Sequence, residues 1–214
     1  MSKPRLLDLF CGAGGCAVGY ARAGFEVVGV DSAPQPHYLF EFHQADALTF
    51  PLDGFDVIHA SPPCQAYTCA KTLPGYKEHP ELVPAMRRRL RASHLPWVME
   101  NVPGAPMPGA ILLCGGMFGL KVRRHRLFES NILLFAPGPC RHTADMVTVY
   151  GDHIRQWKQT AQGERYEVRY PTERGRKAMG IDWMTQREMS QAIPPAYTEY
   201  IGRQLLAYIE SEAA

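Results

Sequence analysis

The stretch DLFCGAGG, residues 8–15, joins an apolar run to a helical pattern, and it decides the fold. Residues 5–10 have the apolar character of a buried β-strand, and residues 17–23 have the periodicity of a helix. Glycine lets the chain turn tightly and lets a ligand approach the backbone closely. A glycine turn from strand to helix therefore favours a parallel sheet with a ligand site at the turn, although an ordinary connection has the same composition.

Short apolar runs and helical stretches alternate through the first hundred residues. This pattern predicts an α/β fold with a mostly parallel sheet and helices on both faces. Residues 80–93 form a predicted helix, and a closing helix over residues 199–209 is expected to pack against the core. Further strands are expected at residues 25–30, just before Asp46, and at residues 55–60, 97–102, 124–129 and 132–135.

Composition limits the protein to a few classes. With 214 residues, 46% of them hydrophobic, the chain has room for one sizeable domain and a small appendage. Its formal net charge of +2 means that any basic surface must be local. The longest apolar stretch, residues 110–120, is too short to span a bilayer. The start of the chain has no signal-peptide pattern and the six cysteines suit a reducing compartment, so free thiols and a cytoplasmic location are expected.

Two acidic residues support a ligand at the glycine turn. Asp31 ends the second predicted strand, where a carboxylate can accept hydrogen bonds from ribose hydroxyls. Asp46 follows the third predicted strand, where it can accept from an adenine amino group. Either acid alone reads as a solvated loop residue, but the three features in this order favour an adenosine-containing cofactor. The turn lacks the P-loop pattern that cradles a triphosphate, which argues against an ATPase.

Two candidate catalytic residues end neighbouring predicted strands. Cys64 lies in SPPCQ, directly after residues 55–60, and Glu100 opens ENV at the end of residues 97–102. In common strand orders the first, fourth and fifth strands lie side by side, about 4.8 Å apart, so both residues would meet the glycine turn in one crevice. Taken singly, a cysteine is usually a small buried hydrophobe and a glutamate ending a strand is usually solvated.

These motifs, in this order, resemble those of the cytosine carbon-5 DNA methyltransferases, and most closely the compact, phage-type members. SPPCQ and ENV are the specific signals. The resemblance implies a Rossmann-like S-adenosylmethionine-dependent methyltransferase fold, in the cytoplasm of a bacterial host or a phage-infected cell. The matching segments are DLFCGAGG (8–15), SPPCQ (61–65), ENV (100–102), RRHRLF (123–128), AMGIDW (178–183) and SQAIPP (190–195).

The resemblance also implies residue roles, because carbon 5 of cytosine is a poor nucleophile that must be activated. The Cys64 thiolate would add to carbon 6, and a protonated Glu100 would donate to ring nitrogen 3 in a nearly dry pocket that raises its pKa. Arg126 would hold the cytosine carbonyl oxygen and Arg124 would pack beside the catalytic loop. Residues i and i+2 share a face of an extended segment, so His125 points away from both arginines. The base that removes the carbon-5 proton is not identified, and a water molecule is one alternative.

The cofactor would occupy the glycine turn and the strand ends around it. Phe10 is expected to stack on adenine, Asp31 to bind the ribose and Asp46 the adenine amino group. The remaining cofactor-binding residues that the resemblance implies are Asp8, Gly12, Gly14, Gly15, Ser32, Ala47, Pro63, Gln191 and Ala192.

The sequence departs from the family pattern in three places. Lys121 and Val122 stand where the family usually has Pro-Gln, and Gln191 replaces an asparagine, which puts one cofactor contact in doubt. The recognition region is also short, at roughly 40 residues from Asn131 to Thr172. We predict a catalytic and cofactor-binding part over residues 1–130, a target-recognition insert over 131–177, and a returning C-terminal segment over 178–214.

The insert mixes cations with aromatic side chains, as a nucleic-acid contact requires, although a solvated insertion has the same composition. Cys140 and His142 alone make a poor zinc site, so no metal is predicted. The expected partner is DNA, as a duplex with the target cytosine flipped out. RNA cytosine is an alternative substrate, and a catalytically weak DNA-binding protein an alternative function. The residues concerned are Arg141, Arg155, Lys158, Arg165, Arg169, Arg174, Arg176 and Lys177, with Tyr150, Trp157, Tyr166 and Tyr170.

Overall fold

The computed structural model describes residues 3–68 and 77–212 and is built on one central sheet. Its strand order is β3-β2-β1-β4-β5-β7-β6, with β1 to β5 parallel and β7 antiparallel to both of its neighbours. The expected neighbours, the first, fourth and fifth strands, are confirmed. The strands are β1 (Arg5–Leu9), β2 (Glu26–Asp31), β3 (Glu41–Gln44), β4 (Val57–Ala60), β5 (Trp97–Asn101), β6 (Ile111–Leu113) and β7 (Arg126–Ser130).

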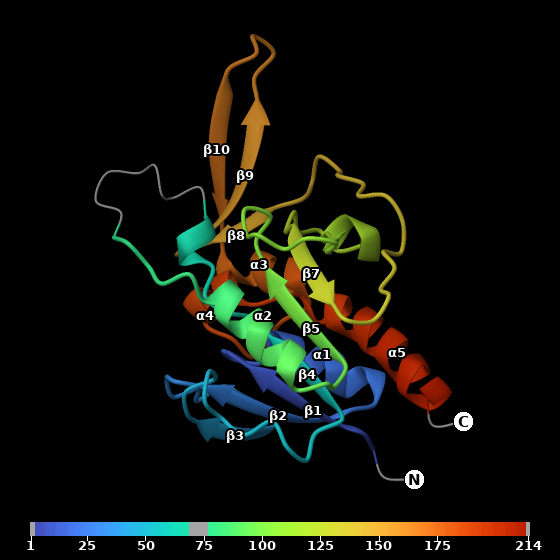
Figure 1. Cartoon of the computed structure of the whole chain (residues 1–214). Helices are drawn as coiled ribbons and strands as arrows, with labels where there is room; N and C mark the ends of the chain where they lie inside the picture. Colours follow the sequence, from blue (N-terminus) through green and yellow to red (C-terminus); the bar gives the residue numbers. More distant parts are fainter. Residues whose placement is uncertain (1–2, 69–76, 213–214) are drawn as a thin grey trace.

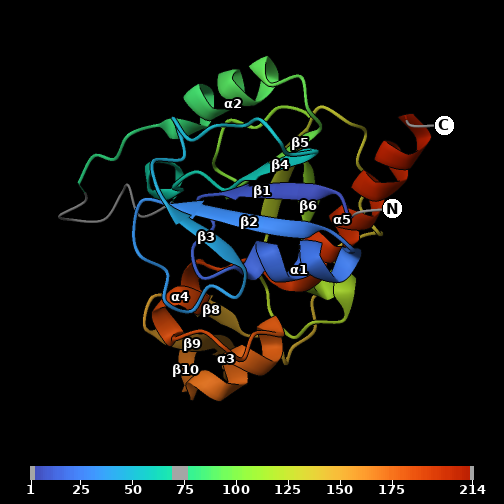
Figure 2. The same ribbon diagram turned by 90° about the horizontal axis from the view of Figure 1, so that it is seen from below.

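Helices cover both faces of this sheet, as predicted (Figure 2). Helix α1 (Gly15–Ala23) and helix α5 (Pro195–Glu212) lie on one face, and α2 (Leu82–Ala92) lies on the other. Helices α1 and α5 pack closely because glycines stand at the contact. A Cβ atom on Gly202 would lie 2.6 Å from the Cβ of Ala23, and one on Gly19 would collide with Thr198 and the Pro195 carbonyl. The C-terminal segment therefore returns to the core.

A second, three-stranded antiparallel sheet lies beyond the central one, in the order β10-β9-β8. It consists of β8 (Thr148–Tyr150), β9 (His153–Gln159) and β10 (Arg165–Tyr170), followed by α3 (Thr172–Met179) and α4 (Gln186–Gln191). The β9–β10 hairpin projects from the body of the molecule (Figure 1). Val149 and Ile154 are buried against α3 and α4, so this segment has a small core that its polar sequence hides. The division of the chain at residues 130 and 177 stays a prediction.

The prediction of a strand over residues 132–135 is wrong, because this segment forms neither a strand nor a helix. The backbone N–H of Phe135 donates to the Gln204 side chain at 2.9 Å, and the Gln204 amide donates to the Phe135 carbonyl at 3.2 Å. Asn131 holds the start of the segment, because its side chain accepts from Trp97 N–H and donates to the Leu95 carbonyl. The Gln204 side chain thus satisfies both backbone groups of Phe135, which a strand would have paired.

Helix α2 carries the arginine-rich run RRRLR at residues 87–91, and only part of this run is exposed to solvent. Arg87 donates two hydrogen bonds to Glu129 of β7, at 2.7 and 2.6 Å, and Arg89 donates to the carbonyls of Ala47 and Phe50. These contacts fasten α2 to the sheet, while Arg88 stays exposed. Within residues 3–68 and 77–212, no helix has the length and apolar character needed to cross a bilayer.

Candidate active site

The glycine turn is held in shape by Asp31. After β1, the chain turns through Phe10 and Gly12, with positive φ angles of 59° and 50°, and Gly14 caps α1 in the left-handed region at 85°. The Gly12 N–H donates to one carboxylate oxygen of Asp31 at 3.1 Å, and the Ala33 N–H donates to the other at 3.0 Å. The acid at the end of β2 therefore lies directly beside the turn, as predicted.

The turn leaves space for a ligand. A Cβ atom placed on Gly12 would meet no atom within 4 Å. Below the turn, Asp8 is fully buried, and neither of its carboxylate oxygens has a hydrogen-bond partner among the described residues. Burial raises the pKa of the Asp8 carboxyl well above its ordinary range, and the charges of Asp31 and Glu100 raise it further. A buried acid without a partner suits a site that a polar or cationic ligand completes.

The other predicted cofactor residues lie around the same strand ends. Ser32 follows Asp31, and its carbonyl accepts from Gln44 at 3.2 Å. Asp46 accepts from the Leu48 N–H at 2.9 Å, which fixes a turn after β3 and leaves the acid exposed. Ala47, the next residue, is buried.

The C-terminal segment closes onto the turn. A Cβ atom on Gly15 would lie 2.5 Å from the Ile193 carbonyl oxygen and 3.2 Å from the Ala192 Cβ, so only glycine fits here. The Trp183 indole N–H donates to the Ala13 carbonyl at 2.9 Å. The neighbouring Gln191 is exposed at the end of α4. Segments about 180 residues apart in sequence thus share one site.

Three predicted catalytic residues come together at the carboxyl ends of β4 and β5 and the start of the antiparallel β7. Cys64 lies after β4 at the start of a short 3-10 helix, η1 (Gln65–Tyr67), behind the exposed Pro63. Glu100 on β5 pairs in register with Phe128, and its carboxylate lies 3.0 Å from the Nε of Arg126 at the start of β7. Both members of this ion pair are buried, with side chains 7% and 8% exposed.

The three groups influence one another electrostatically. Burial raises the pKa of the Cys64 thiol, while the guanidinium of Arg126 opposes the rise and the Glu100 carboxylate adds to it. Burial also raises the pKa of Glu100, again against the opposing charge of Arg126. The site therefore holds a thiol, an acid that protonates easily and a fixed cation, the groups that nucleophilic and general-acid chemistry require.

Arg124 serves the framework around these groups. It is 1% exposed, and its guanidinium donates to the Val149 carbonyl of β8 at 3.0 Å and to the Ser190 carbonyl of α4 at 2.7 Å. Its own carbonyl accepts from the Tyr197 hydroxyl at 2.7 Å. Its charge is still close enough to lower the pKa of Cys64.

Comparison with protein families identifies this arrangement. Residues 4–106, which contain the glycine turn, Cys64 and Glu100, match the family model described as C-5 cytosine-specific DNA methylase. The matched part, residues 4–106, is thus similar to a C-5 cytosine-specific DNA methylase. The resemblance that the motifs indicated is confirmed. A comparison of this sequence with curated proteins finds no match.

Solved structures share the fold of this chain over nearly its whole length. One is described as a DNA modification methyltransferase encoded within an E. coli prophage, with 14% identity, a TM-score of 0.63, and 97% of this chain and 99% of that one covered. A DNMT2 variant from Spodoptera frugiperda has 13% identity and a TM-score of 0.64 over 95% and 99% of the two chains. S. pombe Dnmt2 has the same identity and TM-score over 97% and 99%. These likenesses confirm the predicted Rossmann-like methyltransferase fold.

A chain of buried polar side chains beneath the candidate site was not predicted from the sequence. The Tyr20 hydroxyl lies 2.9 Å from His59 Nδ1, and His59 Nε2 lies 2.8 Å from the Ser61 hydroxyl, which hydrogen-bonds Glu100. Burial lowers the pKa of His59 to about 3, so the ring is neutral. The only sequence signal was a histidine inside an otherwise apolar strand.

A second missed feature surrounds the residue between the two arginines. The ring of His125 points away from Arg124 and Arg126, as predicted, and approaches Cys140, His142 and Cys114. The premise that Cys140 and His142 lack a second ligand pair is therefore wrong. Cys114 and His125 supply that pair, from positions too distant in sequence for ligand spacing to reveal them.

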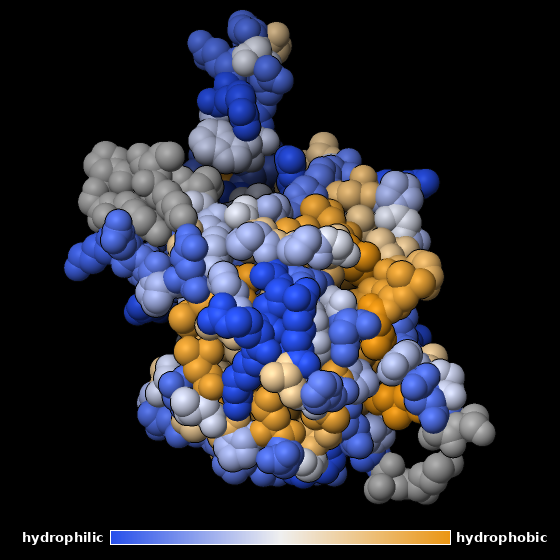
Figure 3. Space-filling view, viewed as in Figure 1, coloured by the Kyte–Doolittle hydropathy of each residue, from blue (hydrophilic) through white to orange (hydrophobic). Residues whose placement is uncertain are grey.

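The projecting hairpin is mostly hydrophilic on its surface (Figure 3) and carries part of the predicted cations and aromatic rings, namely Arg155, Lys158, Arg165, Arg169, Trp157, Tyr166 and Tyr170. Tyr150 lies on β8, the cations Arg174, Arg176 and Lys177 lie on α3, and Arg141 lies in the connection before β8. Trp157 and Tyr166 are about half exposed, at 55% and 46%, and the Arg165 guanidinium lies 5.5 Å from the centre of the Trp157 ring. Arg155 and Arg169 both contact Glu167, at 3.3 and 2.7 Å, so that acid offsets part of their charge.

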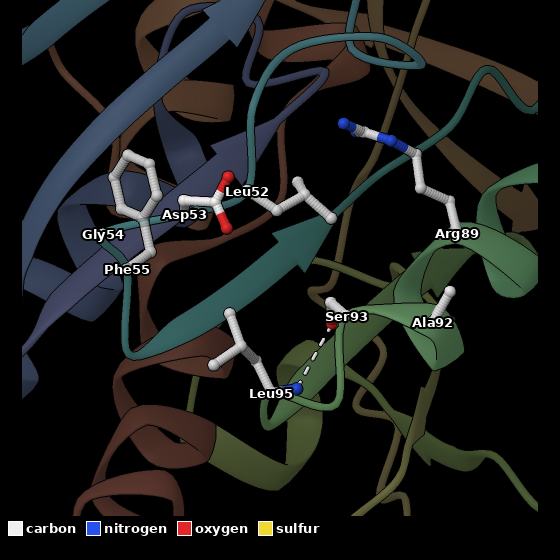
Figure 4. Close-up of a pocket in the computed structure, with 8 residues that line it drawn as sticks. All are labelled: Leu52, Asp53, Gly54, Phe55, Arg89, Ala92, Ser93 and Leu95. Carbon is white, nitrogen blue, oxygen red and sulfur yellow. Dashed lines mark hydrogen bonds between the residues drawn. The ribbon is translucent and has the colours of Figure 1, made fainter.

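A pocket on the surface of the protein lies away from this site (Figure 4). It is lined by the 52–55 loop ahead of β4, by Arg89 near the end of α2 and by Leu95, which follows that helix. That places it at the amino end of β4, whereas Cys64 follows the carboxyl end. Ligands of open α/β sheets bind at the carboxyl ends of the strands, so this pocket plays no part in the candidate site.

Proposed function

We propose that the protein transfers a methyl group from S-adenosylmethionine to carbon 5 of cytosine in DNA, with Cys64 as the nucleophile. The observation that carries the proposal is the placement of Cys64 beside the buried Arg126–Glu100 pair, whose atoms lie 3.0 Å apart. A protein that only bound DNA would have no need to bury a thiol, an acid and a cation together. The match of residues 4–106 to the cytosine methylase family supports the same reaction.

In this mechanism the chain's own residues make carbon 5 reactive. The Cys64 thiolate adds to carbon 6 of the ring, and the electrons of the carbon 5–carbon 6 double bond move toward nitrogen 3. Glu100, in its protonated form, donates its proton to nitrogen 3, and Arg126 binds the adjacent carbonyl oxygen. After methylation, loss of the carbon-5 proton to a base expels the Cys64 thiolate, and nitrogen 3 returns its proton to Glu100, which restores the ring and the acid.

S-adenosylmethionine would supply an electrophilic methyl group. Two observations support its binding at the glycine turn, namely the open space at Gly12 and the buried Asp8 carboxylate that lacks a partner among the described residues. Asp31 would bind the ribose hydroxyls, Phe10 would stack on adenine and Asp46 would accept from the adenine amino group. Ser32, Ala47, Pro63, Gln191 and Ala192 would complete the cofactor site.

A paired, stacked cytosine cannot reach Cys64, so the base must be flipped out of the duplex at a cost of a few kcal/mol. The basic, aromatic hairpin of β9 and β10 would offset that cost through contacts to phosphates and unstacked bases. Arg124, bonded to β8 and α4, would act as a positioning residue that fixes the hairpin relative to Cys64.

The decisive experiment traps the intermediate. Duplex DNA containing 5-fluorocytosine should form a denaturation-resistant adduct with the wild-type protein and S-adenosylmethionine, because fluorine cannot leave as a proton does. Cys64→Ala should form no adduct and transfer no methyl group, while it retains binding of DNA and cofactor. A fully active Cys64→Ala protein would exclude the mechanism.

The substrate is tested in the same way. Tritiated methyl transfer should be fastest on duplex DNA, compared with single-stranded DNA and tRNA at equal cytosine content. Faster labelling of tRNA would replace DNA with RNA as the substrate and leave the chemistry intact. Binding of duplex DNA with no transfer to any of the three substrates would favour the alternative of a catalytically weak DNA-binding protein.

A further inference from the structure

Four potential metal ligands from three parts of the chain converge beside the catalytic arginines. Their donor atoms, the sulfurs of Cys114 and Cys140 and ring nitrogens of His125 and His142, all lie within 4.8 Å of one another. His142 Nε2 lies 3.4 Å from the Cys114 sulfur and 2.9 Å from the Cys140 sulfur. His125 Nε2 lies 3.4 Å from the Cys140 sulfur. The proposed function gives none of these four residues a role.

These distances fit a tetrahedral ion. Zinc binds sulfur at about 2.3 Å and imidazole nitrogen at about 2.0 Å, so a sulfur and a nitrogen on one tetrahedral zinc lie about 3.6 Å apart. Two of the three nitrogen–sulfur distances are 3.4 Å. Small rotations of the exposed His142 side chain would lengthen the third. Two cysteines and two histidines form a closed structural zinc set, and their softness favours zinc over magnesium or calcium.

The surrounding backbone already holds the ligands in place. Cys114 is fully buried directly after β6, and it precedes a 3-10 turn, η3 (Gly115–Phe118). A side chain on Gly116 would collide with the Arg141 carbonyl, so the segment that carries Cys140 and His142 packs directly against that turn. A zinc ion with two thiolates and two neutral imidazoles has no net charge, which suits a partly buried site.

We propose that Cys114, His125, Cys140 and His142 bind one structural zinc ion, which fastens the 131–147 connection to residues 124–126, the segment that leads into β7 and includes Arg124 and Arg126. This connection contains no helix and no named strand in the described structure, so it has few backbone hydrogen bonds of its own. His125 lies between the two arginines, and neighbouring side chains of an extended segment point to opposite faces. The ion would thus hold the arginines toward Cys64 and Glu100 from behind.

The first test is the metal content of untagged, full-length protein, expressed with zinc and purified under reducing conditions. Elemental mass spectrometry should find about one zinc per chain, as a closed site of this kind binds tightly. Replacement by Co²⁺ should give the visible absorption of a tetrahedral thiolate site. A folded wild-type protein with no stoichiometric zinc and no such cobalt spectrum would overturn the proposal.

Variants locate the ion. His142→Ala removes an exposed ligand without opening the core, and it should reduce zinc to near zero, whereas His142→Cys should retain it. His43→Ala, which removes an exposed histidine on β3, and Cys64→Ala, which removes a thiol from outside the cluster, are matched controls that should keep the metal. Zinc retained in full by both His142→Ala and Cys140→Ala would place it elsewhere and exclude this site.

The effect of a chelator on the melting temperature of the wild-type protein tests the site without relying on how the variants fold. The chelator should lower the melting temperature of the wild-type protein and leave that of metal-free His142→Ala unchanged. Mass spectrometry of unreduced peptides decides between the ion and a covalent bond. A disulfide between Cys114 and Cys140 in protein kept under reductant would also overturn the proposal.

Discussion

At the scale of single residues, opposing influences set the pKa of the Cys64 thiol. Burial raises the pKa of the thiol, and the Arg126 guanidinium partly offsets that rise. We therefore expect alkylation of Cys64 by iodoacetamide, followed by mass spectrometry, to increase with pH up to values above the ordinary titration range of a thiol. Arg126→Gln should move the midpoint to still higher pH, because it removes the opposing cation.

The matched comparison is Arg123→Gln, which removes a nearby charge that is not among those acting on the Cys64 thiol. That variant should leave the midpoint unchanged. A midpoint that falls in Arg126→Gln would show that Arg126 does not stabilise the thiolate.

The cofactor offers a second residue-scale prediction. Charge-assisted hydrogen bonds contribute about 1.5–3 kcal/mol each, so Asp31→Ala should weaken S-adenosylmethionine binding roughly ten- to a hundred-fold in calorimetry. The exposed Asp53→Ala, from the loop before β4, is the control. Equal affinity of wild type and Asp31→Ala would remove Asp31 from the cofactor site.

His59 leads to a prediction about stability and pH. Its pKa is lowered to about 3 by burial, whereas an unfolded histidine titrates near 6.5. Between these values the unfolded chain binds a proton that the folded protein does not, so the free energy of unfolding falls as the pH is lowered, by about 1.4 kcal/mol per pH unit for this group. Urea titrations at pH 6.5, 5.5 and 4.5 should show a shallower fall for His59→Gln. Parallel curves for the two proteins would contradict the assignment.

At the scale of elements, the contact between α1 and α5 depends on glycine. Gly19→Ala adds a methyl group that would collide with Thr198 and the Pro195 carbonyl. Overpacking of this kind costs about 1–3 kcal/mol, more than the gain of about 1 kcal/mol from the better helix propensity of alanine. Denaturant titration should show a net loss of stability in Gly19→Ala and almost none in Arg22→Ala, a change on the exposed side of α1. A stabilised Gly19→Ala protein would mean that the two helices can separate slightly.

The β9–β10 hairpin carries two kinds of cation, which salt dependence can separate. Lys158 and Arg165 have no acidic partner among the described ion pairs, whereas Arg169 contacts Glu167 at 2.7 Å. Each lost phosphate contact reduces the slope of log affinity against log salt by about 0.9. Lys158→Gln with Arg165→Gln should therefore reduce the slope for DNA binding by about 1.8, and Arg169→Gln should reduce it less. An unchanged slope in the double variant would remove the hairpin from the DNA interface.

At the scale of the whole molecule, the proposed recognition insert is small beside the proposed catalytic part. The projecting hairpin of β9 and β10 can present only a few side chains to the edges of bases (Figure 1). Each good bidentate base contact gives about 1–3 kcal/mol of discrimination. We therefore expect a short target, a dinucleotide or a degenerate trinucleotide. Bisulfite sequencing of a plasmid methylated by the purified protein tests this, and methylation confined to one site of five or more base pairs would contradict it.

The central sheet could be predicted from sequence because its signals are local. The apolar runs predicted most of the strands. The common order of strands in such sheets then predicted that Cys64, Glu100 and the glycine turn lie at the same edge of the sheet. The prediction of a strand at 132–135 was wrong, and at the end of this segment the Gln204 side chain, distant in sequence, takes both backbone hydrogen bonds of Phe135. The second sheet was not predicted because its few buried residues, such as Val149 and Ile154, are surrounded in the sequence by charged and polar residues. Cys114 and His125 were missed because only the folded chain brings them to Cys140.

The contact between the two ends of the molecule has a consequence for its synthesis. The first helix, α1, needs α5 as its packing partner, and the cofactor turn is closed by Ile193 and by Trp183. The ribosome synthesises α1 early and α5 late. The apolar face of α1 therefore stays exposed in the nascent chain until α5 emerges. Cys64 and Glu100 are translated long before the rest of the site that they need has been made. The nascent chain should therefore remain inactive toward DNA until α5 has left the exit tunnel.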